Sequence, residues 1–256
     1  MSDNPYQTPE AELETASMPG EFNLGQPKSV SPGRSWGWIA DGFGYFKKSP
    51  GAWIGASVVW GVLVIVLNLI PLIGQLAFLL TAYVWVAGFM LGCREQDEGK
   101  AFRFNHLFAG FSNKVGKLIL FSVLVGVIST VVMFVTMGSM LFSMMTGDPA
   151  ASQEMMNNFT GVLLSFLFAM LLLLPLMMAV WFAPALIVLN DVSIGEAMKL
   201  SFIGCLKNIV PFLIYGIIML FLYFLAMLPL LLGFLVLIPV IFASIYVGYK
   251  DIFIES

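Results

Sequence analysis

The residues best able to do chemistry gather in one short stretch, residues 94–106. This stretch reads REQDEGKAFRFNH and holds three carboxylates, three cations and the only histidine of the chain. Clustered carboxylates such as Glu95, Asp97 and Glu98 could hold a divalent cation, and His106 could act as a general base. A lipid-modifying enzyme would need such groups near one membrane surface. A solvated charged loop is the simpler interpretation, because no Ser, Cys or carboxylate has motif spacing to the histidine.

Methionines form a second candidate cluster. Thioether sulfur suits copper(I), and Met140 and Met144 share a helix face. No His or Cys lies near them in sequence, and methionine is also a common gap-filling residue. We find no zinc-site spacing, no phosphate-binding glycine loop and no nucleophile elbow, so we predict no catalytic, cofactor or metal residues and no enzyme. The cluster comprises Met137, Met140, Met144, Met145, Met155 and Met156.

The composition indicates which solvent surrounds these residues. Apolar types make up 59% of the 256 residues and charged types 11%, whereas soluble domains have about 45–50% and about 25%. One soluble core cannot bury so much apolar surface, so lipid is the expected solvent. A basic footprint for nucleic acid is absent, and no nucleic-acid partner is expected.

Six apolar segments are long enough to cross ~30 Å of hydrocarbon. They predict an all-α integral membrane protein with a six-helix bundle. Between the helix ends the segments contain no Asp, Glu, Lys, Arg or His, which argues against proton relay and ion-coupled transport. The segments are residues 51–70, 73–92, 117–143, 159–189, 209–228 and 231–249.

Three further helices are expected to lie on the membrane surface, at 36–48, 104–112 and 193–206, because apolar residues recur there at helical spacing beside basic ones. Each precedes a hairpin of membrane helices. The chain could therefore contain three parallel hairpin repeats, although any hairpin flanked by basic residues would look similar. Their aromatic residues are expected to face lipid or the bundle: Trp36, Phe43, Phe104, Phe108 and Phe202.

The distribution of charge predicts the orientation. All twelve Lys and Arg residues fall on one side of the six crossings. The positive-inside rule makes that side cytoplasmic, so both termini are expected there and the membrane is expected to be a bacterial inner membrane. Residues 1–35 are rich in Pro, Glu, Ser, Gln and Gly and predict a disordered tail. Residues 36–256 form the membrane domain.

Two local features leave alternatives open. The fourth membrane helix contains Pro175 and Pro184; either Pro184 marks the exit from the hydrocarbon, or the prolines lie in a simply tilted helix. Small-residue pairs four apart could form a dimer face or pack helices within the bundle, and we favour the second interpretation. The pairs are Gly51 with Gly55, Gly88 with Gly92, and Ser244 with Gly248.

Several segments resemble one family. They are NPYQTP at 4–9, WGWIADGFGYFKKSPGAWI at 36–54, HLFAGF at 106–111 and WFAPALIVLNDVSIGEAMKLSFIGCLKNIVPF at 181–212. They are similar to an uncharacterised family of bacterial six-helix inner-membrane proteins. The resemblance covers roughly residues 36–250. It implies the localisation and the helix count, and it carries no site residue.

Three classes of function remain. We expect an inner-membrane protein without enzymatic signature that acts as a scaffold, binds a partner or organises the bilayer. The alternative is a transporter or channel for an apolar or neutral solute, and a lipid-modifying enzyme would depend on the charged stretch at 94–106. Expected partners are membrane lipids, with a second copy of the chain or another membrane protein left open.

Overall fold

A computed structural model describes residues 23–146, 153 and 157–255. Residues 1–22 of the predicted tail and most of the polar loop at 144–158 lie outside the described residues. The described chain is largely helical. Its helices are α1 (Arg34–Lys48), α2 (Pro50–Leu69), α3 (Ile73–Asp97), α4 (His106–Ser112), α5 (Val115–Thr146), α7 (Phe159–Trp181), α8 (Ala183–Asn190), α9 (Ile194–Lys207), α10 (Ile209–Met227) and α11 (Phe234–Phe253).

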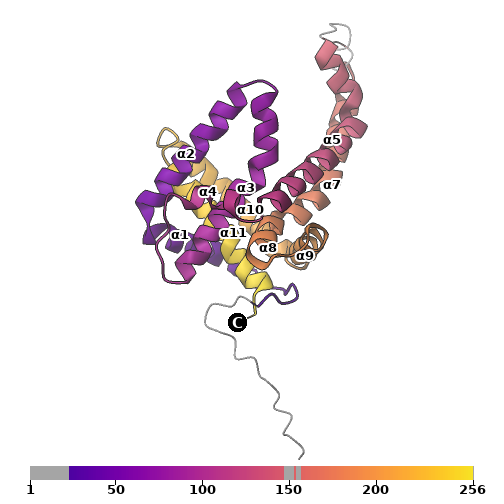
Figure 1. The fold of residues 1–256 in the computed structure, drawn as a ribbon. Coiled ribbons are helices and arrows are strands. Elements are labelled where there is room, and N and C mark those ends of the chain that lie inside the picture. Colours follow the sequence, from indigo (N-terminus) through magenta and orange to yellow (C-terminus); the bar gives the residue numbers. More distant parts are fainter. Residues whose placement is uncertain (1–22, 147–152, 154–156, 256) are drawn as a thin grey trace, which may run out of the picture.

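Six segments of the described chain are long and apolar enough to cross a membrane, judged by length and composition. They form three hairpins, α2–α3, α5–α7 and α10–α11, whose tips lie away from the C-terminal end (Figure 1). The predicted all-α fold with six spanning helices is confirmed. The opposite side, residues 23–48, 94–117, 183–208 and 250–255, holds all twelve Lys and Arg residues and is called the basic side below.

The core of the molecule is built around α11. Twelve of its twenty residues are buried, whereas α7 buries only Ala169. Next to α11, the helix α1 passes so close that a Cβ added to Gly42 would lie 2.9 Å from the backbone nitrogen of Ser244. The Ser244 hydroxyl also pairs with that of Tyr215 at 2.7 Å, which ties α11 to α10. The hairpin α5–α7 extends away from this core (Figure 1).

Small residues on α3 pack within the chain. A Cβ added to Gly88 would lie 2.5 Å from the carbonyl oxygen of His106 on α4, and one added to Gly92 would meet the ring of Phe102 at 2.3 Å. Backbones can approach this closely only where side chains are absent. The pair Gly88 and Gly92 therefore packs α3 against α4 and the segment before it. By contrast, Gly51 has no atom within 4 Å of its added Cβ.

Helices occur where the three surface helices were predicted, as α1, α4 and α9. α4 is shorter than the predicted 104–112, because it begins at His106. Trp36, Phe43, Phe104 and Phe108 are all exposed. That these helices lie along the membrane interface, and that the hairpins are repeats, stay predictions.

The fourth spanning segment is broken between α7 and α8, just before Pro184. The backbone N–H of Phe182 would normally donate to the carbonyl of Met178. Instead it donates to the hydroxyl of Ser201 on α9 at 3.0 Å, and that hydroxyl donates to the Met178 carbonyl at 2.7 Å. A side chain inserted into the helical ladder is a recognised cause of a kink. The break thus arises from Ser201 together with Pro184, whereas Pro175 lies inside α7.

The end of the predicted tail is held against the basic side. Asn208, fully buried, accepts a hydrogen bond from the Val30 N–H at 2.8 Å and donates one to the Lys28 carbonyl at 3.0 Å. Leu24 forms an isolated antiparallel bridge with Ile254. Residues 24–30 therefore connect the C-terminal ends of α9 and α11. Disorder was predicted for residues 1–35, and it is wrong for residues 24–30 because these bonds hold them in place. For residues 1–22 it stays a prediction.

Candidate functional site

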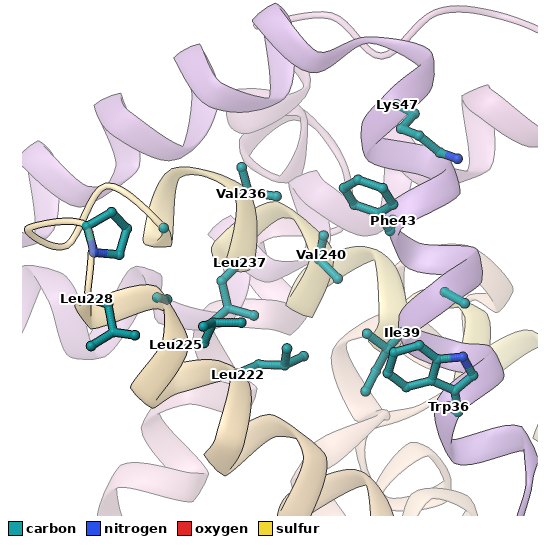
Figure 2. A pocket seen from close by; sticks show the side chains of 14 residues that line it. Trp36, Ile39, Phe43, Lys47, Leu222, Leu225, Leu228, Val236, Leu237 and Val240 are labelled. Carbon is teal, nitrogen blue, oxygen red and sulfur yellow. The ribbon is translucent and has the colours of Figure 1, made fainter.

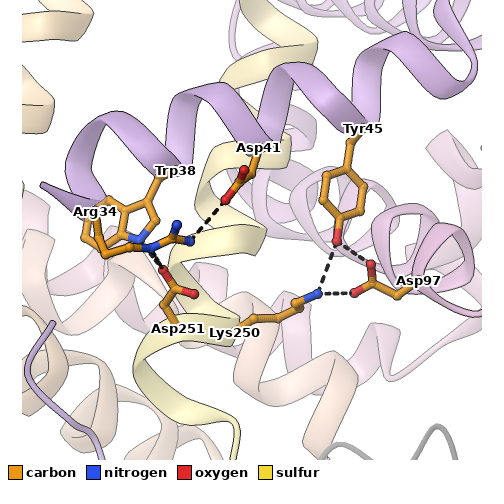
Figure 3. A network of polar contacts seen from close by, with 7 residues as sticks. All are labelled: Arg34, Trp38, Asp41, Tyr45, Asp97, Lys250 and Asp251. Carbon is orange, nitrogen blue, oxygen red and sulfur yellow. Dashed lines mark hydrogen bonds and ion pairs between the residues drawn. The ribbon is translucent and has the colours of Figure 1, made fainter. Parts of the chain in front are cut away.

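The most connected polar cluster joins α1, α3 and α11 on the basic side. The carboxylate of Asp97 accepts hydrogen bonds from the hydroxyls of Tyr45 and, at 2.9 Å, Tyr246, and its Oδ2 lies 2.6 Å from the ammonium group of Lys250 (Figure 3). Burial, followed by the bond to Asp97, raises the pKa of Tyr45 well above its usual range. The phenol therefore stays protonated and serves as a donor, so the cluster is a clamp between three helices.

A second cluster fixes the start of α1 to the end of α11. Asp251 accepts from the guanidinium of Arg34 at 2.7 Å and from the indole N–H of Trp38 at 2.9 Å (Figure 3). Asp41 also pairs with Arg34, at 3.1 Å. The bond to Asp251 raises the pKa of Arg34 above its usual value. Arg34, Asp41 and Asp251 are therefore paired with one another.

The charged stretch 94–106 separates into different contacts. Glu95 Oε2 lies 3.1 Å from Nε2 of the buried His106 and 3.4 Å from Arg103. The other ring nitrogen of His106, Nδ1, accepts a hydrogen bond from the Arg103 N–H at 3.0 Å. Glu98 pairs with Lys100 at 2.8 Å. The structure thus brings Glu95 and His106 together and directs Asp97 to α1 and α11.

Sequence reasoning missed these pairings. Tyr45, Asp97 and Lys250 are separated by 52 and 153 positions, and no spacing rule connects such distant residues. One available signal was the position of two acids, Asp97 and Asp251, near the ends of helices that are apolar over the rest of their length. A charge at such a position needs a partner when it is partly buried.

A further ion pair links α5 to the turn after α8. Asp191, in the left-handed conformation, lies 2.5 Å from the ammonium of Lys114 and 2.6 Å from that of Lys117. Hydrogen bonding to these lysines lowers the pKa of Asp191 to about 2. Nearby, the hydroxyl of Tyr249 donates to Asn190. These contacts fix the basic end of the fourth span.

In the described part of the chain, no three or more His, Cys, Asp or Glu side chains lie close enough together to hold a metal ion. Cys93 and Cys205 are both buried and unbridged. Among the methionines, Met137 is buried and Met145 is exposed, while Met155 and Met156 lie outside the described residues.

The cavities lie elsewhere. One is a groove of about 940 Å³ between α1 and the hairpin α10–α11 (Figure 2). Its lining is apolar except for Lys47 at one end. A second apolar cavity of about 460 Å³ lies among α7, α9, α10 and α11. A third, of about 390 Å³, is charged and lies between residues 28–34 and the end of α11. Glu95, Asp97, Glu98 and His106 line none of these three cavities.

Comparison with known proteins agrees with the six apolar helices. A curated protein of Burkholderia thailandensis is 26% identical over 198 residues, which is 73% of each chain, and is named as a probable inner membrane protein. The chain is a membrane protein. The resemblance found in the sequence is confirmed to that extent. No protein-family model and no solved structure matches the chain.

Proposed function

We propose that this membrane protein is a non-enzymatic scaffold of the inner membrane that holds a partner protein through the hairpin α5–α7. The observation that carries the proposal is which partners the ionisable side chains contact. Asp97 and Asp251 are held in ion pairs that clamp helices together, and the two apolar cavities are lined by no carboxylate and no histidine. Of the ionisable groups that line the charged cavity of about 390 Å³, Arg34, Lys250 and Asp251 belong to these pairs. A catalytic site would instead place such groups together around a substrate-sized pocket.

The partner surface is assigned to α7. Its apolar side chains are exposed around most of its circumference, because the helix contacts its own chain only along a narrow stripe. Pro175 also lacks the N–H that would pair with the Leu171 carbonyl. In hydrocarbon, a neighbouring helix commonly satisfies such a carbonyl.

The proposed orientation places the basic side and both ends of the chain in the cytoplasm, as the positive-inside rule favours. A cysteine introduced at Gly99 should be protected from an impermeant thiol reagent added outside the cell, and one at Ala150 should react. The native thiols should give little background because both are buried, and burial raises the pKa of Cys205 to about 12. Labelling of the Gly99 position alone would reverse the orientation.

The scaffold role is tested by the size of the complex extracted from the native membrane in its own lipid. We expect the wild type to migrate with a stoichiometric protein partner, and Phe168→Ser with Leu171→Ser to release it. The matched control is Val58→Ser with Val62→Ser on α2, which should leave the complex intact. A wild-type chain that is extracted alone, in lipid only, would contradict the proposal.

The alternative, a transporter for an apolar or neutral solute, is favoured only by the size of the apolar groove. It predicts solute flux in vesicles that contain the purified chain alone. The scaffold predicts no such flux.

A further inference from the structure

Two lysines at the end of α1 differ from the other basic residues. All but two of the twelve Lys and Arg side chains pair with a carboxylate or donate a hydrogen bond to a backbone carbonyl. Lys47 and Lys48 make neither contact with the described residues. Their ammonium groups lie 5.3 Å and 5.0 Å from the ring centroids of Phe43 and Tyr45. α1 therefore ends in two exposed positive charges that have no counter-charge among the described side chains.

One of these lysines, Lys47, also forms the end of the groove of about 940 Å³. Along α1 the groove follows one helical face, from Trp36 through Ile39 and Phe43 to Lys47 (Figure 2). The opposite wall consists of apolar residues from α10 and α11 and reaches the turn between them. Its volume of about 940 Å³ lies at the upper end of the ~300–1,000 Å³ of small-molecule sites.

The lining determines which ligand fits. Apart from the ammonium group of Lys47 and the indole N–H of Trp36, the side chains that line the groove are apolar, so a polar solute would lose more hydrogen bonds to water than it gains. The wall extends from Lys47 on the basic side to Gly233 at a hairpin tip, across a protein that lies in lipid. A ligand with one charged end and a long apolar body matches this arrangement.

We propose that the groove binds an anionic phospholipid of the surrounding bilayer, with its phosphate at Lys47 and Lys48 and an acyl chain along the apolar wall. Ammonium groups attract phosphate, and basic residues next to a membrane favour anionic over zwitterionic lipids. Among the described residues, the two lysines form no ion pair that a phosphate would have to displace. This site is independent of the partner proposed for α7, because it lies on α1, α10 and α11.

The test uses the purified full-length chain with equimolar phosphatidylglycerol and phosphatidylcholine, and native mass spectrometry counts the lipid retained. Each lysine near an anionic surface contributes ~1 kcal/mol, so two should favour phosphatidylglycerol by roughly tenfold or more. Lys47→Gln with Lys48→Gln should bring the two lipids to near-equal retention. Lys199→Gln, an exposed lysine on α9, is the matched control and should keep the preference.

A second variant tests the groove itself. Ala40 is exposed and lines the groove, so Ala40→Phe should fill the space without entering the core and should abolish retention of phosphatidylglycerol. Val127→Phe on α5, also at an exposed position, should retain it. Equal retention of both lipids by the wild type, or an undiminished preference in the double lysine variant, would overturn the charge assignment. Retention that survives Ala40→Phe would overturn the location.

A measurement on the folded wild-type protein tests the same proposal even if the variants fail to fold. Phosphatidylglycerol with brominated acyl chains should quench the fluorescence of Trp36, measured as the difference between the wild type and Trp36→Phe. Brominated phosphatidylcholine should quench it less. Equal quenching by the two lipids would contradict the proposal. Because these assays contain no partner protein, their failure would leave the scaffold proposal untouched.

Discussion

Removing the carboxylate of Asp97 should destabilise the fold far more than removing an exposed acid. Asp97 accepts from two tyrosine hydroxyls and pairs with Lys250. Hydrogen bonds to charged groups contribute ~1.5–3 kcal/mol each, and a partly exposed ion pair adds less than about 1 kcal/mol. Since contributions within one network overlap, we expect Asp97→Ala to cost about 3–5 kcal/mol.

The assay is thermal unfolding of the purified chain in detergent, followed by intrinsic fluorescence at one scan rate, because unfolding of such proteins is often irreversible. For a chain of this length, 1 kcal/mol corresponds to about 2–4 °C, so Asp97→Ala should melt at least about 6 °C below wild type. Glu196→Gln, which removes an exposed pair with Lys199, is the control and should shift the Tm by less than about 2 °C. Equal Tm values for Asp97→Ala and Glu196→Gln would refute the claim that Asp97 clamps the three helices together.

Three further predictions follow from the packing and the ion pairs. Gly110→Ala places its Cβ 2.0 Å from a backbone oxygen of α3 and should lower the Tm sharply. The control Gly44→Ala meets no atom within 4 Å and should raise the Tm slightly through helix propensity. An unchanged Tm in Gly110→Ala would contradict the close contact. Ser201→Ala should allow the Phe182 N–H to bond directly to the Met178 carbonyl, because the hydroxyl between them is removed. This change should straighten α7 and α8 and lengthen the distance between spin labels placed on them. An unchanged distance distribution would assign the break to proline alone. The lowered pKa of Asp191 means that its pairs with Lys114, just before α5, and Lys117 in α5 stabilise the fold above about pH 4 and are lost as the pH falls to about 2. Asp191→Asn should therefore flatten that part of the Tm–pH profile, and an unaltered profile would show that the pairs carry no stability.

The spanning helices could be predicted because their signal is local. A run of about 20 apolar residues is recognisable without knowing its neighbours, and the six predicted spans correspond to the six found. Boundaries differ where tertiary contacts extend a helix: the span predicted to end at residue 92 continues to Asp97, whose carboxylate is held by α1 and α11.

Features that depend on distant pairings could not be predicted. The spacing between Glu95 and His106 matches no motif, yet the turn before α4 brings them to 3.1 Å. The break near Pro184 was one of two interpretations of the proline, but the role of Ser201 required the packing of α9 on α7. The groove required the relative placement of α1 and the last hairpin. Each depends on residues whose separation in sequence gives no indication of contact.

The scaffold role is tested most directly by photo-crosslinking along α7 in the native membrane. A photoreactive amino acid is placed in turn at ten consecutive positions, residues 163–172, and the products are separated into protein and lipid adducts. The account predicts protein adducts that recur at about 3.6 residues, the period of one helix face in contact with a partner. Adducts to lipid alone at all ten positions would contradict it.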